Sequence, residues 1–234
     1  MNSKLLFYLF LLVAASQIFS PGGRLSMMLH QPLDFIFLLL SILIALVIHE
    51  FCHALAADRL GDPNPRIAGR VSLNPLAHLD PFGTILIIVT GFGWGKPVSF
   101  DPYNLQDPAK DGALIAAAGP LSNIGLAIIC ALILRFLPLP MTPTTLTIIN
   151  FIVTLFSVNL SLAIFNLLPF YPLDGHHIIR AFLPRTTRAS YDLFNRHFGM
   201  FLAFVLIIPW GGTSLVSYLM TPTLNFAYSL LLGV

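Results

Sequence analysis

Long apolar stretches alternate with short polar connections along this chain. The stretches cover residues 5–20, 34–57, 112–136, 146–168 and 199–220, and an apolar tail follows at 223–234. The stretch 199–220 is expected to be interrupted by Pro209, Gly211 and Gly212. Most approach the roughly 20 residues that an α-helix needs to cross hydrocarbon. Residues 5–20 are expected to form a retained first span, with a cleaved secretory signal as the alternative. The pattern predicts an all-α polytopic membrane protein, a bundle of about five to six transmembrane helices.

Residues 81–98 are too apolar for an ordinary loop, but their run before Gly91 is too short to cross comfortably. Backbone groups at membrane depth need partners from protein or water, because lipid offers none. We therefore expect a re-entrant loop or a short β-hairpin here, forming one wall of a cavity.

Composition supports a membrane protein and excludes several other classes. Hydrophobic residues make up 56% of the chain and charged residues 9%, and the mean hydropathy is +0.84. Soluble domains carry about a quarter charged residues. The net charge is only +2 and no basic run occurs, so nucleic-acid binding is not expected. Cys52 and Cys130 both lie in apolar stretches, where a thiol acts as a small hydrophobe, so no disulfide framework is predicted.

Lysine and arginine are divided very unevenly between the two sides of the predicted bundle. With a cytoplasmic N-terminus, only Arg24 and Arg135 fall outside. The cytoplasmic side collects Lys4, Arg59, Arg66, Arg70, Lys96, Lys110, Arg180, Arg185, Arg188 and Arg196. Because cytoplasmic loops carry the excess of positive residues, the loops after 34–57 and 146–168 are expected to face the cytoplasm.

Three residues near the cytoplasmic end of the stretch 34–57 form an H-E-x-x-H motif. His49 and His53 are four residues apart and project from one helix face, so both imidazoles can bind one metal ion. Glu50 is the only glutamate in the chain, and an ionisable group inside an apolar helix costs roughly 2.5–3.5 kcal/mol on insertion scales. This cost argues against a chance pairing of histidines within a bundle and favours a catalytic Zn²⁺ site, one per chain.

A catalytic zinc ion takes three protein ligands, so one more is needed. Asp174 follows the stretch 146–168 on a turn rich in proline and glycine, where a carboxylate at membrane depth needs a cation or a strong donor. Two alternatives remain at this point. Asp174 could instead cap a helix over residues 176–182, and His176 or His177 could be the third ligand.

The two motifs together resemble the site-2 protease family of intramembrane zinc metalloproteases. The resemblance rests on H-E-x-x-H in one span and N-x-x-P-x-x-P-L-D-G, residues 166–175, in a later one. Residues 58–63, 69–81, 93–98 and 119–123 extend it to the small prokaryotic members without PDZ or CBS domains. It covers about residues 28–234 and implies a single membrane-embedded protease domain over 1–234, in which residues 1–27 are an extra N-terminal segment.

Residue by residue, the resemblance implies roles in peptide hydrolysis. His49, His53 and Asp174 would bind zinc, and Glu50 would act as general base and then protonate the leaving amine. Substrate binding or oxyanion stabilisation would fall to Asn166 and Asn123.

The implied function is hydrolysis of peptide bonds in or near transmembrane segments, as in regulated intramembrane proteolysis. The implied location is the prokaryotic cytoplasmic membrane, with an active site open to the cytoplasm, and the partners are transmembrane protein substrates and the lipid bilayer. The alternatives are a metal-dependent transporter, an inactive metal-binding scaffold, and a metalloprotease that acts on soluble peptides or on a lipidated tail. Transporters tend to carry internal repeats, whereas the H-E-x-x-H stretch has no second copy in this sequence.

Overall fold

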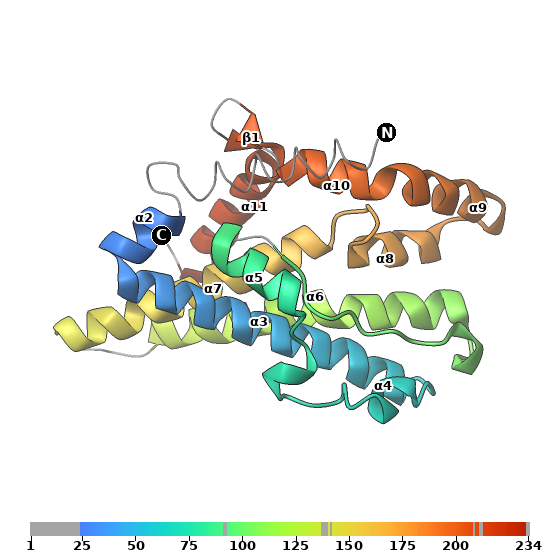
Figure 1. Cartoon of the computed structure of the whole chain (residues 1–234), viewed down its shortest axis with the longest axis horizontal. Helices are drawn as coiled ribbons and strands as arrows, with labels where there is room; N and C mark the ends of the chain where they lie inside the picture. The colour runs from blue at the N-terminus through green and yellow to red at the C-terminus, as the bar shows by residue number, and fades with distance from the viewer. Residues whose placement is uncertain are drawn as a thin grey trace.

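The computed structural model describes residues 24–90, 93–136, 140, 142–207, 209–210 and 213–232. The predicted first span or signal at 5–20 lies outside these residues. The described chain is predominantly helical, as predicted. Three long helices lie alongside one another, and shorter helices gather at one end and along one side (Figure 1).

Three long helices occupy three of the stretches predicted to span the membrane. They are α3 (Pro32–Arg59), α6 (Pro108–Phe136) and α7 (Pro143–Asn166), and each is long and apolar enough to cross a membrane. Each begins with a proline, which suits the first turn because that N–H has no helical partner in any case. Thr142 adds a capping box in front of α7. All three pack against one another and form the frame that carries the site.

The connection between α3 and α6 contains several short elements. They are α4 (Asn64–Ile67), η1 (Pro75–Ala77), α5 (Pro81–Thr90) and η2 (Pro102–Asn104). Leu79 and Gly95 form an antiparallel bridge, so the chain returns beside the point where α5 begins. A Cβ on Gly83 would lie 2.0 Å from the carbonyl oxygen of Trp94, so α5 and the returning segment are in very close contact. A helix therefore stands where a β-hairpin was one of the two expectations, because a helix pairs its own backbone groups.

Asp62 ties the two ends of this connection together. Its carboxylate is fully buried and accepts hydrogen bonds from the backbone N–H groups of Asn64 and Asp101 and from the side chain of Asn104. Arg70 is buried as well and donates to two backbone carbonyl groups of the same connection. These charged groups stabilise a compact polar cap at the end of α3.

The predicted span over 199–220 is divided in the structure. Helix α9 (Arg185–Phe194), a π-turn η3 (Asn195–Gly199) and α10 (Met200–Ile207) follow one another without a break. The two-residue strands β1 (Pro209–Trp210) and β2 (Thr213–Ser214) then pair, and α11 (Leu215–Leu232) begins. The predicted interruption at Pro209 is confirmed, because proline has no N–H with which to continue a helix.

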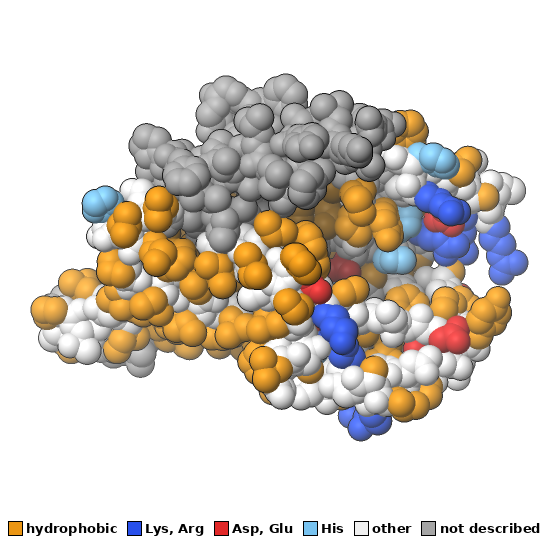
Figure 2. Space-filling view, viewed as in Figure 1, with side chains coloured by type: hydrophobic (Ala, Val, Ile, Leu, Met, Phe, Trp, Pro, Cys, Tyr) orange, Lys and Arg blue, Asp and Glu red, His pale blue; other side chains and the backbone are white. Residues whose placement is uncertain are grey.

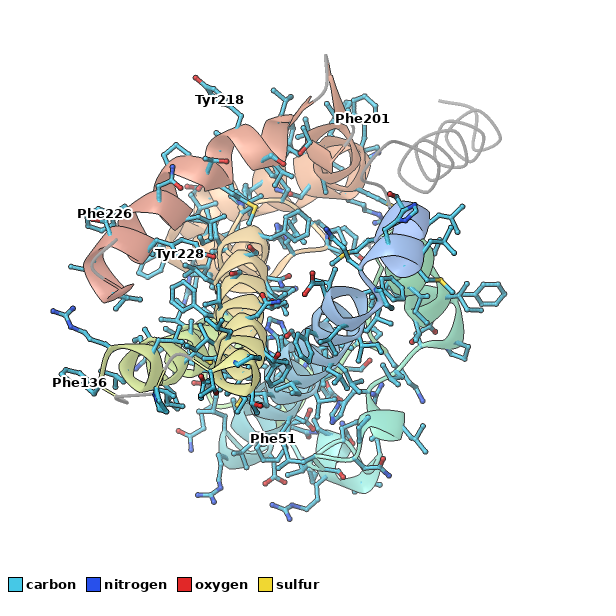
Figure 3. All side chains as sticks on the ribbon, turned by 90° about the vertical axis from the view of Figure 1, so that its left-hand side faces the viewer. Phe51, Phe136, Phe201, Tyr218, Phe226 and Tyr228 are labelled. Carbon is cyan, nitrogen blue, oxygen red and sulfur yellow. The ribbon has the colours of Figure 1, made fainter. Side chains whose placement is uncertain are left out.

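Helix α11 packs against α7 through an aromatic contact. The rings of Tyr228 and Phe156 are 5.0 Å apart, and the Tyr228 hydroxyl hydrogen-bonds Ser157. Figure 3 shows Tyr228 directed toward α7, while Tyr218 and Phe226 point away from the bundle. Both outward residues are largely exposed, which fits a helix with one face toward lipid.

Polar and apolar side chains are separated along the molecule. In Figure 2 hydrophobic side chains cover much of the long helices, and Lys and Arg gather at the end that holds α4, α8 (Asp174–Phe182) and α9. Arg135 lies in the last turn of α6, whereas Lys110 lies in its first turn, so these two cations are separated by roughly 38 Å of helix.

Candidate metal centre

His49 and His53 lie on one face of α3, as their spacing predicts. Both are almost fully buried, with 4% and 6% of their surface exposed. Their Nε2 atoms are 3.0 Å apart, and the ring planes are nearly perpendicular, at 87°. Two ring nitrogens are thus aimed at one point in the bundle.

Asp174, the first residue of α8, reaches the same point. Its Oδ2 lies 3.1 Å from the Nε2 of His49 and 3.3 Å from the Nε2 of His53. That oxygen is buried and has no hydrogen bond within the described chain. The helix-capping alternative has no support, because the cap position is Leu173 and no side chain caps this end.

These three atoms fit a tetrahedral zinc ion. Ligand atoms about 2.0–2.1 Å from such an ion lie roughly 3.3 Å from one another. The observed triangle has sides of 3.0, 3.1 and 3.3 Å. Two imidazole nitrogens and one carboxylate oxygen are also a donor set that catalytic zinc sites use. A buried carboxylate oxygen without a hydrogen-bond donor is typical of a metal ligand, because the cation takes the place of the donor.

Hydrogen bonds on the far side of each imidazole set its tautomer. The Nδ1 of His53 donates to the carbonyl oxygen of Ile115 over 2.7 Å, and the Nδ1 of His49 donates to Oδ1 of Asn123 over 2.6 Å. With the proton on Nδ1, the lone pair of each neutral ring is on Nε2, the atom that faces Asp174. Both histidines are therefore held in the form that binds metal.

A second asparagine fixes the orientation of the first. Asn123 and Asn159 are fully buried, and Nδ2 of Asn123 donates to Oδ1 of Asn159 and to the carbonyl oxygen of Ala45. Nδ2 of Asn159 in turn donates to the carbonyl oxygen of Leu155. Because Nδ2 of Asn123 faces two acceptors, the other end of this carboxamide, Oδ1, is the atom that faces His49. The chain of hydrogen bonds thus links α7 through α6 to the first histidine.

Gly119 on α6 leaves the space that the two imidazoles occupy. A Cβ at this position would lie 2.3 Å from Nε2 of His53 and 2.7 Å from Cε1 of His49. Gly175, next to Asp174, is equally confined, since a Cβ there would lie 2.3 Å from two backbone carbonyl oxygens at the end of α7. Glycine is required at both positions for the three ligand groups to approach.

The turn before Asp174 is held by the helix that follows α8. The Tyr191 hydroxyl donates to the carbonyl oxygen of Pro169, and Oδ1 of the buried Asn195 accepts from the backbone N–H of Tyr171. This brace extends over α9 and η3, and π-turns of the η3 type often occur at functional sites.

The alternative ligands His176 and His177 lie outside the metal cluster. The His176 ring stacks on Tyr191, with centroids 5.0 Å apart and planes 14° apart, and the His177 ring faces Phe100 at 6.5 Å. Burial lowers the pKa of both imidazoles. Neither ring reaches the triangle formed by His49, His53 and Asp174.

Glu50 and Asn166 have few contacts. Glu50 is half-buried and makes no hydrogen bond or ion pair within the described residues, which leaves its carboxylate available. The Nδ2 of Asn166 donates to the carbonyl oxygen of Leu162 in its own helix. The general-base role of Glu50 and the substrate roles of Asn166 and Asn123 stay predictions.

The sequence reasoning missed two groups that orient the imidazoles, the Ile115 carbonyl group, which contacts His53 directly, and Asn159, which acts through Asn123. Asn159 carried a signal, since a carboxamide inside an apolar helix needs a partner. The carbonyl group of Ile115 carried none, because every residue has one.

Comparison with known proteins identifies related chains. The model of the peptidase family M50 matches residues 139–209, which include Asp174. Two similar proteins bear the name "Putative zinc metalloprotease". YwhC of Bacillus subtilis is 37% identical over 202 residues, which cover 84% of this chain and 90% of that protein. Rip2 of Mycolicibacterium smegmatis is 28% identical over 231 residues, which cover 93% of this chain and 81% of that protein. No solved structure matches the chain.

Proposed function

Because this chain belongs to peptidase family M50 and is an intramembrane zinc metalloprotease, we propose that His49, His53 and Asp174 hold its zinc ion and that Glu50 is its general base. The observation that carries this assignment is the triangle of two Nε2 atoms and one Oδ2 atom, with sides of 3.0 to 3.3 Å. The transporter and scaffold alternatives are not favoured, because the related proteins are named as metalloproteases.

The chain's own residues supply positioning and proton transfer. When bound, zinc supplies Lewis acidity toward water and toward the scissile carbonyl group. Glu50, next to His49 in the sequence, accepts the proton of the attacking water and passes it to the nitrogen of the leaving amine. Asn123 orients His49, and Asn166 contacts the substrate near the scissile bond.

The proposed substrates are transmembrane proteins cut in or near their spans. A peptide bond inside a helix is shielded by the hydrogen bonds of that helix, so the substrate unwinds locally before it is cut. The position of His49 in α3, one of the spanning helices, supports a bond cut at membrane depth. The bilayer is thus both the solvent of the enzyme and the source of its substrate.

The proposed topology is one protease domain over residues 1–234, with a catalytic core over 28–234 and residues 1–27 as an extra N-terminal segment. Helices α3, α6 and α7 span the membrane, the helical segments 185–207 and 215–232 bring the count to about five, and α5 is re-entrant. The end of the bundle that holds α4, α8 and α9 faces the cytoplasm, an orientation that the gathering of Lys and Arg at this end supports (Figure 2).

Substitution of Glu50 by glutamine tests the assignment. The purified Glu50→Gln variant should keep about one zinc per chain, because Glu50 is not among the clustered ligands, while cleavage of a model transmembrane peptide falls by roughly 10²–10⁴-fold. Asp174→Ala should lose both zinc and cleavage. Undiminished cleavage by the zinc-loaded Glu50→Gln variant would overturn the proposed mechanism, and faster cleavage of a soluble peptide than of a bilayer-inserted one would overturn the proposed substrate class.

A further inference from the structure

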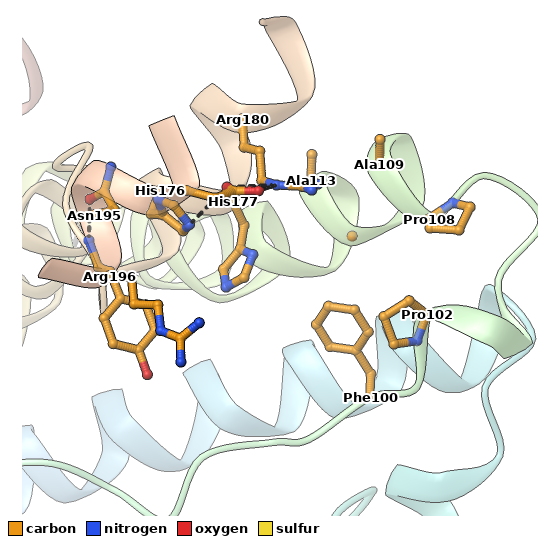
Figure 4. A pocket seen from close by; sticks show the side chains of 13 residues that line it. Phe100, Pro102, Pro108, Ala109, Ala113, His176, His177, Arg180, Asn195 and Arg196 are labelled. Atoms are coloured by element: carbon orange, nitrogen blue, oxygen red, sulfur yellow. Dashed lines mark hydrogen bonds and ion pairs between the residues drawn. The ribbon is translucent and has the colours of Figure 1, made fainter. Parts of the chain in front are cut away.

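A cavity of about 580 Å³ lies beside the metal centre. Its walls come from the segment before α6, the first turns of α6, helix α8 and the α9–η3 helix (Figure 4). The residues that line it include Phe100, His176, His177, Arg180, Asp192 and Arg196. Ligand pockets in proteins are about 300–1,000 Å³, so this cavity has room for part of a peptide chain.

The cavity begins within one helical turn of a metal-cluster residue. His176 and His177 line it and follow Asp174 in α8 by two and three residues. One turn of helix rises about 5.4 Å. The cavity therefore lies next to the proposed catalytic centre, close enough to receive substrate residues near the scissile bond.

One of the two arginines on the cavity wall has no acidic partner within the described residues. Arg180 is neutralised by Asp192, since its Nε lies 2.8 and 2.9 Å from the two carboxylate oxygens. Arg196 is exposed and has no hydrogen bond or ion pair in the described part of the chain. Figure 4 shows its side chain directed into the cavity, on the side of His177. A free guanidinium binds carboxylates through two parallel hydrogen bonds.

A buried imidazole on the same wall contacts Asp192. His176 is 7% exposed, and its Nδ1 makes no hydrogen bond within the described residues. Nε2 of the same ring lies 3.8 Å from Oδ1 of Asp192, the carboxylate that also pairs with Arg180, so Arg196 stays the unpaired charge of this wall among the described residues. Phe100 supplies an apolar surface on the facing wall.

From these observations we propose that the cavity is a substrate subsite for an acidic side chain, bound by Arg196. The acidic residue lies a few positions from the scissile bond, on the part of the substrate that leaves the membrane on the α8–α9 side. The subsite deepens the proposed function and rests on it, because it assumes that the substrate is a peptide cut at the zinc site formed by His49, His53 and Asp174. Arg196 here determines specificity and takes no part in proton transfer.

A position scan in the substrate tests the subsite. A model transmembrane peptide carries a single Glu, or Gln in its place, at each of the first six or so positions beyond the scissile bond on that side. Both series are cleaved by zinc-loaded wild-type enzyme and by the Arg196→Gln variant. Arg185→Gln is the matched control, because Arg185 is exposed on the same helical segment and does not line the cavity.

The wild type should prefer Glu over Gln at one position by roughly three- to tenfold in kcat/KM, mainly through KM, as expected for a partly exposed charge pair. Arg196→Gln should reduce that ratio to near one, and Arg185→Gln should keep it. Arg196→Glu should prefer a lysine at the same position, a reversal that a merely structural role would not produce.

The failures of the two proposals are distinguishable. Zinc-loaded wild type that cuts no peptide of either series overturns the proposed function. Equal cleavage of the Glu and Gln series by wild type, or an equal loss for both series in Arg196→Gln, overturns the subsite alone. A change confined to inhibition by the cleaved product would assign Arg196 to the new terminal carboxylate instead and would also overturn the proposal.

Discussion

Replacement of Gly119 by alanine should strongly weaken zinc binding while the bundle still folds. The added Cβ would lie 2.3 Å from Nε2 of His53. Non-bonded carbon and nitrogen atoms settle at about 3.5 Å or more, so the ring or the helix has to move by roughly 1 Å. Metal–ligand distances tolerate about 0.2 Å. A displacement several times that tolerance removes a ligand atom from its position.

The cost to stability is smaller than the cost to metal binding. Overpacking typically destabilises a protein by about 1–3 kcal/mol, which is partly offset by the gain of about 0.5–1 kcal/mol for alanine over glycine inside a helix. Loss of an outer-shell partner already weakens metal binding about 10–100-fold. A shifted ligand should weaken it further, so we expect a loss of zinc affinity beyond about 100-fold.

The assay is zinc content per chain and a zinc titration of metal-free protein in detergent. Helicity and a monodisperse profile in size-exclusion chromatography report that the variant is folded. Gly125→Ala is the matched control, because Gly125 lies on the same helix and a Cβ there meets nothing within 4 Å. Retention of one zinc per chain with wild-type affinity in Gly119→Ala would refute the placement of the imidazoles against α6.

Two further predictions concern groups outside the ligand set. Asn159→Leu removes an acceptor from Asn123 and should weaken zinc binding by roughly tenfold through His49, without loss of fold, as a zinc titration can measure; unchanged affinity would show that the second asparagine has no part in the site. In Asp62→Asn an amide nitrogen replaces one carboxylate oxygen, so at least one of the three donors to Asp62 loses its acceptor. The free energy of unfolding of this variant should fall by about 1–3 kcal/mol, as unfolding in detergent can measure. Its zinc content should not change, and a loss of zinc would contradict the purely structural role of Asp62.

The helical frame follows from local information. Apolar runs of spanning length are visible in the sequence at 34–57, 112–136 and 146–168, and α3, α6 and α7 occupy them. The division of 199–220 was signalled by Pro209 but not resolved, since a proline can either kink a helix or end one. Here the helix ends before Pro209, and the next helix, α11, packs against α7 through Tyr228 and Phe156.

The sequence alone determined that two imidazoles and a glutamate share one helix, because i and i+4 positions face the same way in any α-helix. Only the tertiary structure decided that Asp174, more than a hundred residues later, lies 3.1 Å from His49, since that distance depends on how α3, α6, α7 and α8 pack. The same packing decided the outer partners, Asn159 and the Ile115 carbonyl group. Contacts between distant segments depend on the summed fit of many side chains, and no local pattern in the sequence records that sum.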